Sequence, residues 1–117
     1  MHELSVTEGL IRIVVEEAKN RNIKKVTRIN LVIGELTSII DDSVQFYYDI
    51  LSKGTVAAGA VLSSRRIEAE FSCRACGNVY QRQSYSYSCP KCGGKGVITN
   101  KGQEFYIESI EVETDED

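Results

Sequence analysis

Four cysteines form two Cys-x-x-Cys pairs, Cys73 with Cys76 and Cys89 with Cys92, and the 117-residue chain contains no other cysteine. Two such pairs, twelve residues apart, are typical of a tetrahedral four-thiolate site, and zinc is the metal that best suits one. A glycine follows the second cysteine of each pair. Because glycine adopts positive φ, backbone N–H groups can turn toward the sulfurs. The sequence therefore predicts a structural zinc site.

Redox catalysis and disulfide bonding are two other uses of cysteine pairs. A redox Cys-x-x-Cys starts a helix after a strand, usually in one copy, whereas glycine and turn residues follow both pairs here. Disulfides would require an oxidising compartment, and the opening MHELSVTEGL lacks the pattern of a secretion signal. No stretch approaches the length of a membrane span. We therefore expect a cytoplasmic protein with reduced thiols and no membrane partner.

Residues suited to catalysis are scarce. A closed four-thiolate site has no open position for water or substrate. His2, the only histidine, completes no Ser-His-Asp or Cys-His arrangement in a recognisable local motif. Gly93-Gly94-Lys95-Gly96 lacks the spacing and hydroxyl residue of a phosphate loop, and Asp41-Asp42 suits the start of a helix. The sequence indicates a protein that is not an enzyme.

His2 has two interpretations. A polar residue near a chain terminus commonly has no role. Alternatively, one metal ion could bind the terminal amine of Met1, the backbone nitrogen of His2 and its imidazole, which close two small chelate rings in one plane. A square-planar, nitrogen-rich donor set favours Ni(II) or Cu(II). The fourth donor stays open between the Glu3 backbone nitrogen, a carboxylate, water and a group from a partner.

Hydrophobic periodicity indicates the elements that must position these residues. Ser5 with Glu8 fits a capping box, so we expect a helix from about 5 to 20 and a short arm over residues 1–4. A second helix is expected over about 42–53, and strands are expected over 25–34, about 61–71 and about 103–113. This order predicts an α+β fold in which a small three-stranded mixed sheet carries two helices on one face.

Residues 72–97 are expected to form an inserted zinc-knuckle, zinc-ribbon-like lobe, while 1–71 and 98–117 form the α/β domain. The insert has few apolar side chains and cannot offset its ordering entropy unaided. Structural zinc contributes on the order of 10–16 kcal/mol in isolated fingers. The metal must therefore hold this lobe together.

Charge supports one alternative function. The net charge of −3 argues against a basic nucleic-acid binder, but residues 72–101 contain five basic residues and no acidic one. The basic residues and tyrosines of this stretch are Arg74, Arg82, Lys91, Lys95, Lys101, Tyr80, Tyr85 and Tyr87. They could meet phosphates and stack on bases in a zinc-ribbon nucleic-acid-binding module. A solvated basic face, with tyrosines that cover a thin zinc core, is the simpler interpretation.

Several motifs together resemble the HypA family, and the resemblance covers essentially the whole chain. They are Met1-His2-Glu3-Leu4-Ser5, Ile33-Gly34-Glu35, Gly54-Thr55 with Gly59-Ala60, and the two cysteine knuckles, in the same order. The resemblance implies a nickel chaperone for [NiFe]-hydrogenase maturation, which in some bacteria also serves urease. It also implies two lobes, with nickel on 1–71 and 98–117 and zinc on 72–97.

The resemblance also assigns residues and partners. It implies Ni(II) as transferred cargo on His2, with the Met1 amine and with Glu3 beside it, and structural Zn(II) on the four cysteines. Its partners would be the GTPase HypB, the [NiFe]-hydrogenase large-subunit precursor and, where urease is served, the urease maturation proteins. Some relatives carry further histidines that can supply a nickel donor, which this chain lacks. An edge strand leaves both a monomer and a homodimer open.

Overall fold

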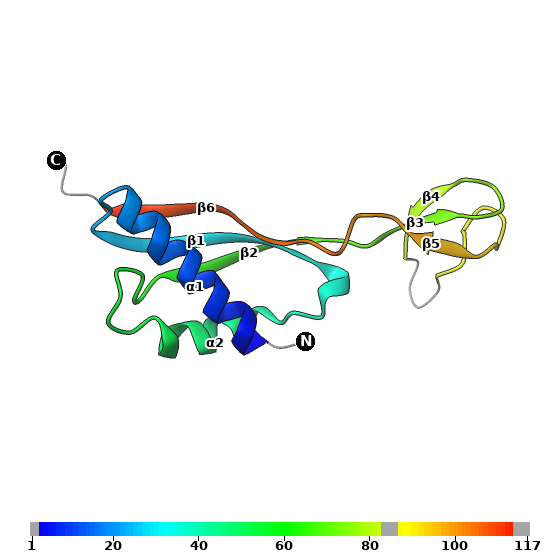
Figure 1. The fold of residues 1–117 in the computed structure, drawn as a ribbon. Helices are drawn as coiled ribbons and strands as arrows, with labels where there is room; N and C mark the ends of the chain where they lie inside the picture. The colour runs from blue at the N-terminus through cyan, green and yellow to red at the C-terminus, as the bar shows by residue number, and fades with distance from the viewer. Residues whose placement is uncertain (1–2, 83–86, 114–117) are drawn as a thin grey trace. The chain divides into compact units, whose positions relative to one another are not determined.

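Two helices, a short 3₁₀ helix and six strands make up the computed structural model, which describes residues 3–82 and 87–113 (Figure 1). The elements are α1 (Glu3–Asn20), β1 (Lys25–Gly34), η1 (Glu35–Thr37), α2 (Asp41–Leu51), β2 (Val61–Ile67), β3 (Glu70–Cys73), β4 (Val79–Gln81), β5 (Gly96–Ile98) and β6 (Phe105–Glu113). The chain divides into two compact units. Residues up to 32, 38–65 and from 106 on form the first, and 33–37 with 66–105 form the second.

The first unit contains a three-stranded sheet in the order β2–β1–β6. Thr27 Oγ1 donates a hydrogen bond to the Glu111 carbonyl, and Asn30 Nδ2 donates one to Ser109 Oγ, each over 3.0 Å. Because the numbers rise along β1 as they fall along β6, these two strands are antiparallel. β2 runs parallel to β1. The segment between these two strands contains α2, and it carries the chain back to the end of the sheet at which β1 begins (Figure 1). The predicted mixed sheet is confirmed.

Both helices pack against each other and bury apolar faces in the core of this unit. The fully buried core side chains come from both helices and from β1, and they include Val14, Val26, Ile29, Leu31, Val44 and Tyr48. Burial of one large aliphatic side chain contributes about 1.5–3 kcal/mol, which makes this cluster the main support of the unit. Among the described residues neither helix is long and apolar enough to cross a membrane.

The start of α1 differs from the sequence prediction. Ser5 was expected to be the N-cap, but the helix already begins at Glu3. The predicted capping box is therefore wrong. The predicted arm over residues 1–4 is wrong for Glu3 and Leu4, which are helical. The Thr7 hydroxyl donates to the Glu3 carbonyl over 2.5 Å, and the Glu3 carboxylate accepts a hydrogen bond from Ile40 N over 3.2 Å. A contact with a residue so distant in the chain favours the longer helix, and local spacing could not reveal it.

The second unit contains its own antiparallel sheet in the order β4–β3–β5. The single strand expected over 61–71 is therefore two strands, β2 in the first sheet and β3 in the second. Between them, the Ala69 N–H donates to Glu35 Oε1 over 2.7 Å instead of continuing a ladder. The buried core cluster of this unit consists of Ala69, Phe71, Cys73, Tyr80 and Cys89. Two of the four cysteines thus belong to its core.

Gly34 lies where the second unit brings three backbone segments together. A Cβ at Gly34 would lie 2.2 Å from the carbonyl carbon and oxygen of Gly102, and a Cβ at Gly102 would lie 2.8 Å from Ala69 Cα. Hydrogen bonds from Gly34 N to Glu104 O and from Leu36 N to Gly102 O, each 2.7 Å, hold the segments at this distance. Only glycine fits at Gly34 without displacing the backbone.

Candidate metal centre

Each cysteine pair lies on a tight turn that a glycine closes. Gly77 has φ 77° and Gly93 has φ 75°, as the sequence predicted for the residue after each pair. Gly77 N donates to the Cys73 carbonyl over 3.0 Å, and Gly93 N donates to the Cys89 carbonyl over 2.8 Å. These left-handed residues bend each chain segment back on itself, so that both sulfurs of a pair point to the same side.

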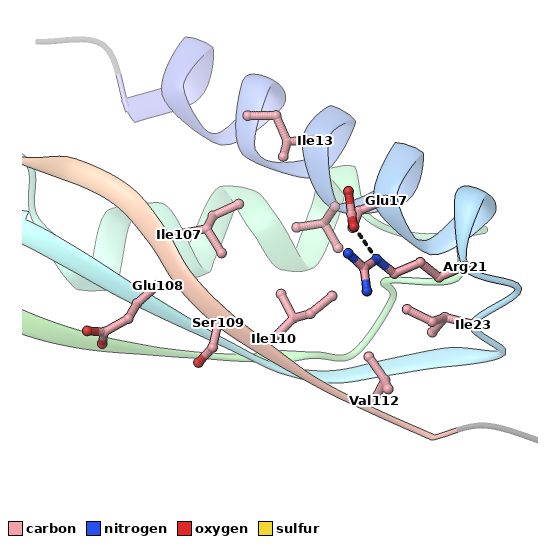
Figure 2. A pocket seen from close by; sticks show the side chains of 10 residues that line it. Ile13, Glu17, Arg21, Ile23, Ile107, Glu108, Ser109, Ile110 and Val112 are labelled. Atoms are coloured by element: carbon pink, nitrogen blue, oxygen red, sulfur yellow. Dashed lines mark hydrogen bonds and ion pairs between the residues drawn. The ribbon is translucent and has the colours of Figure 1, made fainter. Parts of the chain in front are cut away.

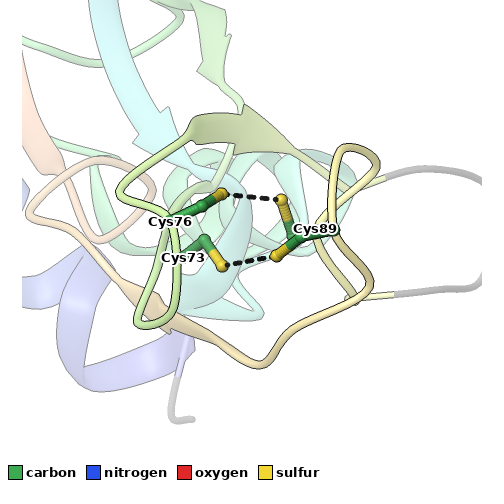
Figure 3. Close-up of side chains that lie close together, drawn as sticks. Cys73, Cys76 and Cys89 are labelled. Carbon is green, nitrogen blue, oxygen red and sulfur yellow. Dashed lines mark hydrogen bonds between the residues drawn. The ribbon is translucent and has the colours of Figure 1, made fainter.

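The four sulfurs converge on one point (Figure 3). All four Sγ atoms lie within 4.8 Å of one another. Two sulfur–sulfur contacts join different pairs, 3.5 Å between Cys73 and Cys92 and 3.7 Å between Cys76 and Cys89. Cys73 and Cys89 are buried, whereas Cys76 and Cys92 are exposed. The structure thus brings together all four predicted zinc residues, two of them buried and two exposed to solvent.

Backbone and side-chain N–H groups point at the sulfurs. Three backbone bonds of 3.4 Å join Ala75 N to Cys73 Sγ, Lys91 N to Cys89 Sγ and Gly94 N to Cys92 Sγ. Asn78 Nδ2 donates a fourth hydrogen bond, 3.6 Å long, to Cys89 Sγ. N–H donors stabilise the thiolate form, which is the form that binds metal. Asn78 is a contributor that the sequence analysis did not identify.

The thiol pKa values show why the cluster needs a cation. Burial raises the pKa of Cys89, but N–H groups around it outweigh this effect and lower the value to about 6. A backbone N–H lowers the pKa of Cys92, yet hydrogen bonds with the neighbouring thiols Cys73 and Cys76 raise it to about 12. Sulfurs this close do not all ionise together unless a cation offsets their mutual repulsion. A divalent metal would release the remaining protons.

Zinc fits this donor set. Four thiolates without an oxygen or nitrogen ligand are typical of closed, structural zinc sites. All four cysteines are free of disulfides. Neither pair begins a helix, because Cys73 ends β3 and α1 and α2 both lie before residue 52, so the arrangement differs from a redox Cys-x-x-Cys. The residues that would hold zinc are Cys73, Cys76, Cys89 and Cys92.

Tyr80 and Tyr87 pack in the thin core of the metal lobe (residues 71–98). Phe71 stacks on Tyr80 with ring centroids 5.8 Å apart, and it meets Tyr87 edge-on at 5.3 Å. The Tyr80 hydroxyl donates to the Tyr87 carbonyl over 2.6 Å. Arg82 lies over the Tyr87 ring and pairs with Glu35 at 3.5 Å. These engagements favour a packing role over the nucleic-acid interpretation, and Tyr85 lies outside the described residues.

Of the residues predicted to bind nickel, the structure describes one, Glu3. Met1 and His2 lie outside the described residues. Glu3 is the first residue of α1, and its carboxylate accepts the Ile40 N–H. Ile40 is the N-cap residue of α2 and provides no side-chain cap of its own. The Glu3 carboxylate therefore joins the starts of the two helices.

A groove of about 550 Å³ lies between α1 and β6 (Figure 2). Its walls are mainly aliphatic, from Ile13, Ile23, Ile107, Ile110 and Val112, and an ion pair between Glu17 and Arg21 lies beside them. Among the described residues that line it there is no cysteine. The groove is therefore separate from the cysteines predicted to bind zinc.

Comparison with known proteins gives a consistent result. The family model described as "HypA: Hydrogenase/urease nickel incorporation, metallochaperone" matches residues 1–112. A hydrogenase maturation factor HypA from Caldanaerobacter subterraneus subsp. tengcongensis is 57% identical over 97% of this chain and 100% of its own length. One from Dehalococcoides mccartyi strain 195 is 48% identical over 97% of this chain and 95% of its own.

Solved structures agree in fold. The solution structure of the Ni metallochaperone HypA from Helicobacter pylori is similar with a TM-score of 0.65 and 25% identity, over 98% of this chain and 100% of that one. A second, the solution structure of HypA protein, gives a TM-score of 0.71 and 27% identity over 98% of both chains. The similarity covers both units of the chain.

Proposed function

This chain belongs to the HypA family of hydrogenase maturation factors, and from that premise we propose that it is a nickel metallochaperone that delivers Ni(II) during [NiFe]-hydrogenase maturation. The observation that carries the proposal is the family match, which extends over residues 1–112 and so includes the Met-His-Glu start. The chain acts by binding and transfer and not as an enzyme. Delivery of Ni(II) to urease is a second function that the family description includes.

The proposed nickel site uses the terminal amine of Met1 with the backbone nitrogen and imidazole of His2. The Glu3 carboxylate is engaged at Ile40 N, which supports its backbone nitrogen as the fourth donor. Four nitrogen donors in one plane suit Ni(II).

The second metal is proposed to be zinc with a structural role. The four converging thiols support this assignment, because a closed thiolate site offers no position to a substrate. Nickel would then belong to residues 1–71 and 98–117, and zinc to 72–97. The proposed partners are the GTPase HypB and the hydrogenase large-subunit precursor, all within the cytoplasm.

Titration of Ni(II) into zinc-loaded protein with a native N-terminus tests the proposal. We expect one tight nickel equivalent by calorimetry and a square-planar absorption spectrum. His2→Ala removes the imidazole, and a peptide extension ahead of Met1 removes the free amine, so each should abolish binding while zinc content stays constant. Proteolytic removal of the extension, which regenerates Met1, is the matched control and should restore binding. Undiminished nickel affinity in both altered chains would defeat the proposal.

A further inference from the structure

We propose that Cys76 is the first site of oxidative or electrophilic modification in the metal lobe, and that peroxide converts it to a disulfide with Cys89. The inference rests on the proposed zinc site, because zinc holds the sulfurs as thiolates. It follows from a difference among four cysteines that are equivalent in the sequence pattern.

Access restricts attack to two sulfurs. Cys73 and Cys89 are each only 3% exposed and lie in the core of the second unit. Cys76 and Cys92, the second members of their pairs, are exposed. A small reagent dissolved in water therefore meets Cys76 and Cys92 before the other two.

Hydrogen bonding then distinguishes the two exposed sulfurs. Cys92 Sγ accepts the Gly94 N–H over 3.4 Å. In the part of the chain that the structure describes, Cys76 Sγ accepts no hydrogen bond from a nitrogen, and it lies 3.7 Å from the sulfur of Cys89. An N–H donor draws electron density from a thiolate and makes it a weaker nucleophile. Cys76 is thus the exposed sulfur with the more available electron pair.

The reaction with peroxide balances in two steps. The Cys76 thiolate attacks one oxygen of the peroxide, so an S–O bond forms, the O–O bond breaks and hydroxide leaves. The product is a sulfenic acid. The Cys89 thiolate, whose Sγ lies 3.7 Å away, attacks the sulfenic sulfur, and an S–S bond forms as a second hydroxide leaves. Two thiolates are oxidised by two electrons, and one peroxide is reduced.

Loss of zinc would follow from the charge balance. The disulfide removes two of the four thiolate ligands, and two thiolates hold zinc less firmly than four. The aromatic core of Phe71, Tyr80 and Tyr87 is small, so the lobe would loosen when its metal leaves. Oxidation of the metal lobe by peroxide thus begins at Cys76 Sγ and leads to loss of the metal.

Limited alkylation of the unmodified, zinc-loaded chain tests the order of attack. Trypsin cleaves after Arg74, Arg82, Lys91 and Lys95 and so places each cysteine on its own peptide. With less than one equivalent of N-ethylmaleimide, we expect at least about fivefold more adduct on Cys76 than on Cys92, the ratio for one hydrogen bond of about 1 kcal/mol. Equal labelling, or labelling of Cys92 first, would overturn the inference.

Peroxide treatment tests the disulfide. Zinc release, followed with a chromophoric chelator, should rise in step with a Cys76–Cys89 peptide pair found by mass spectrometry. A first disulfide within one pair, such as Cys73–Cys76, would overturn the inference. Both measurements use the unmodified, zinc-loaded chain, so neither depends on a variant that lacks one of the proposed zinc ligands.

Zinc content measured before any reagent is added separates this inference from the proposal on which it rests. A chain that binds no zinc refutes the zinc assignment. A zinc-loaded chain that reacts first at another cysteine refutes only the order of modification.

Discussion

Replacement of Glu3 by alanine should destabilise the first unit without removing a nickel donor. The Glu3 carboxylate accepts the N–H of Ile40 over 3.2 Å, at the start of a helix whose N-cap residue has no capping side chain of its own. The first N–H groups of a helix have no partner within the helix, so an acceptor from elsewhere satisfies one of them. Glu3→Ala leaves that group to water.

The size of the effect follows from this geometry. Loss of an N-terminal cap costs about 0.5–2 kcal/mol, and the partly exposed position of Glu3 places it near the middle of that range, at about 1 kcal/mol. This corresponds to a decrease in Tm of about 4–8 °C for a small domain. Glu3→Gln keeps a neutral acceptor, and a neutral hydrogen bond is about half as strong as one to a charge. Its loss should therefore be about half as large.

Urea unfolding followed by far-UV circular dichroism measures this loss, and calorimetry measures nickel binding on the same samples. Glu8→Ala, which removes an exposed acid from the same helix, is the control and should change stability by less than about 0.5 kcal/mol. Nickel affinity should stay close to that of the unmodified chain, because alanine retains the backbone nitrogen. A Glu3→Ala chain with full stability but no nickel binding would refute the reasoning and make the carboxylate a ligand.

Three further changes have defined outcomes. Tyr48→Phe removes a buried 2.5 Å hydrogen bond to the Ala57 carbonyl and should cost about 1–3 kcal/mol in urea unfolding. Burial and the nearby Asp49 raise the pKa of Tyr48 to about 12, so stability present below pH 10 should be lost as pH rises through 12, and the variant should lack this loss. Gly34→Ala should destabilise by about 1–3 kcal/mol or more, because its Cβ would lie 2.2 Å from Gly102. The control Gly9→Ala, on a helix with open space, should stabilise slightly, and an equal response of both would contradict the clash. Zinc removal by a chelator should broaden amide signals of the second unit while those of the first persist, and joint loss would contradict independent units.

Patterns that repeat along the chain predicted most elements of the fold. Helical spacing indicated α1 and α2 within a few residues, and alternation indicated β1 and β6. The alternation of β6 breaks at Glu108-Ser109, where two consecutive side chains are exposed. Cysteine spacing predicted the converging thiols, because so short a repeat leaves few other arrangements.

Features that depend on contacts between distant residues were not predictable in this way. The run over 61–71 has the composition of one strand, and only the bond between Ala69 N and Glu35 marks where it changes sheets. β4 and β5 are three residues long, which is too short for a periodic signal. The differences in exposure and hydrogen bonding among the four sulfurs likewise depend on three-dimensional packing.

The register of the second sheet allows the metal lobe to be removed genetically. Thr99 N donates to the Glu70 carbonyl over 3.0 Å, next to the antiparallel pair of Phe71 with Ile98. This bond has the geometry that joins the two ends of a two-residue β-turn. An Asn-Gly dipeptide in place of residues 71–98 would therefore close the chain without stretching it, and would leave the proposed N-terminal nickel ligands on a smaller protein. Comparison of this deletion variant with the full chain would measure how much the metal lobe contributes to the proposed nickel transfer.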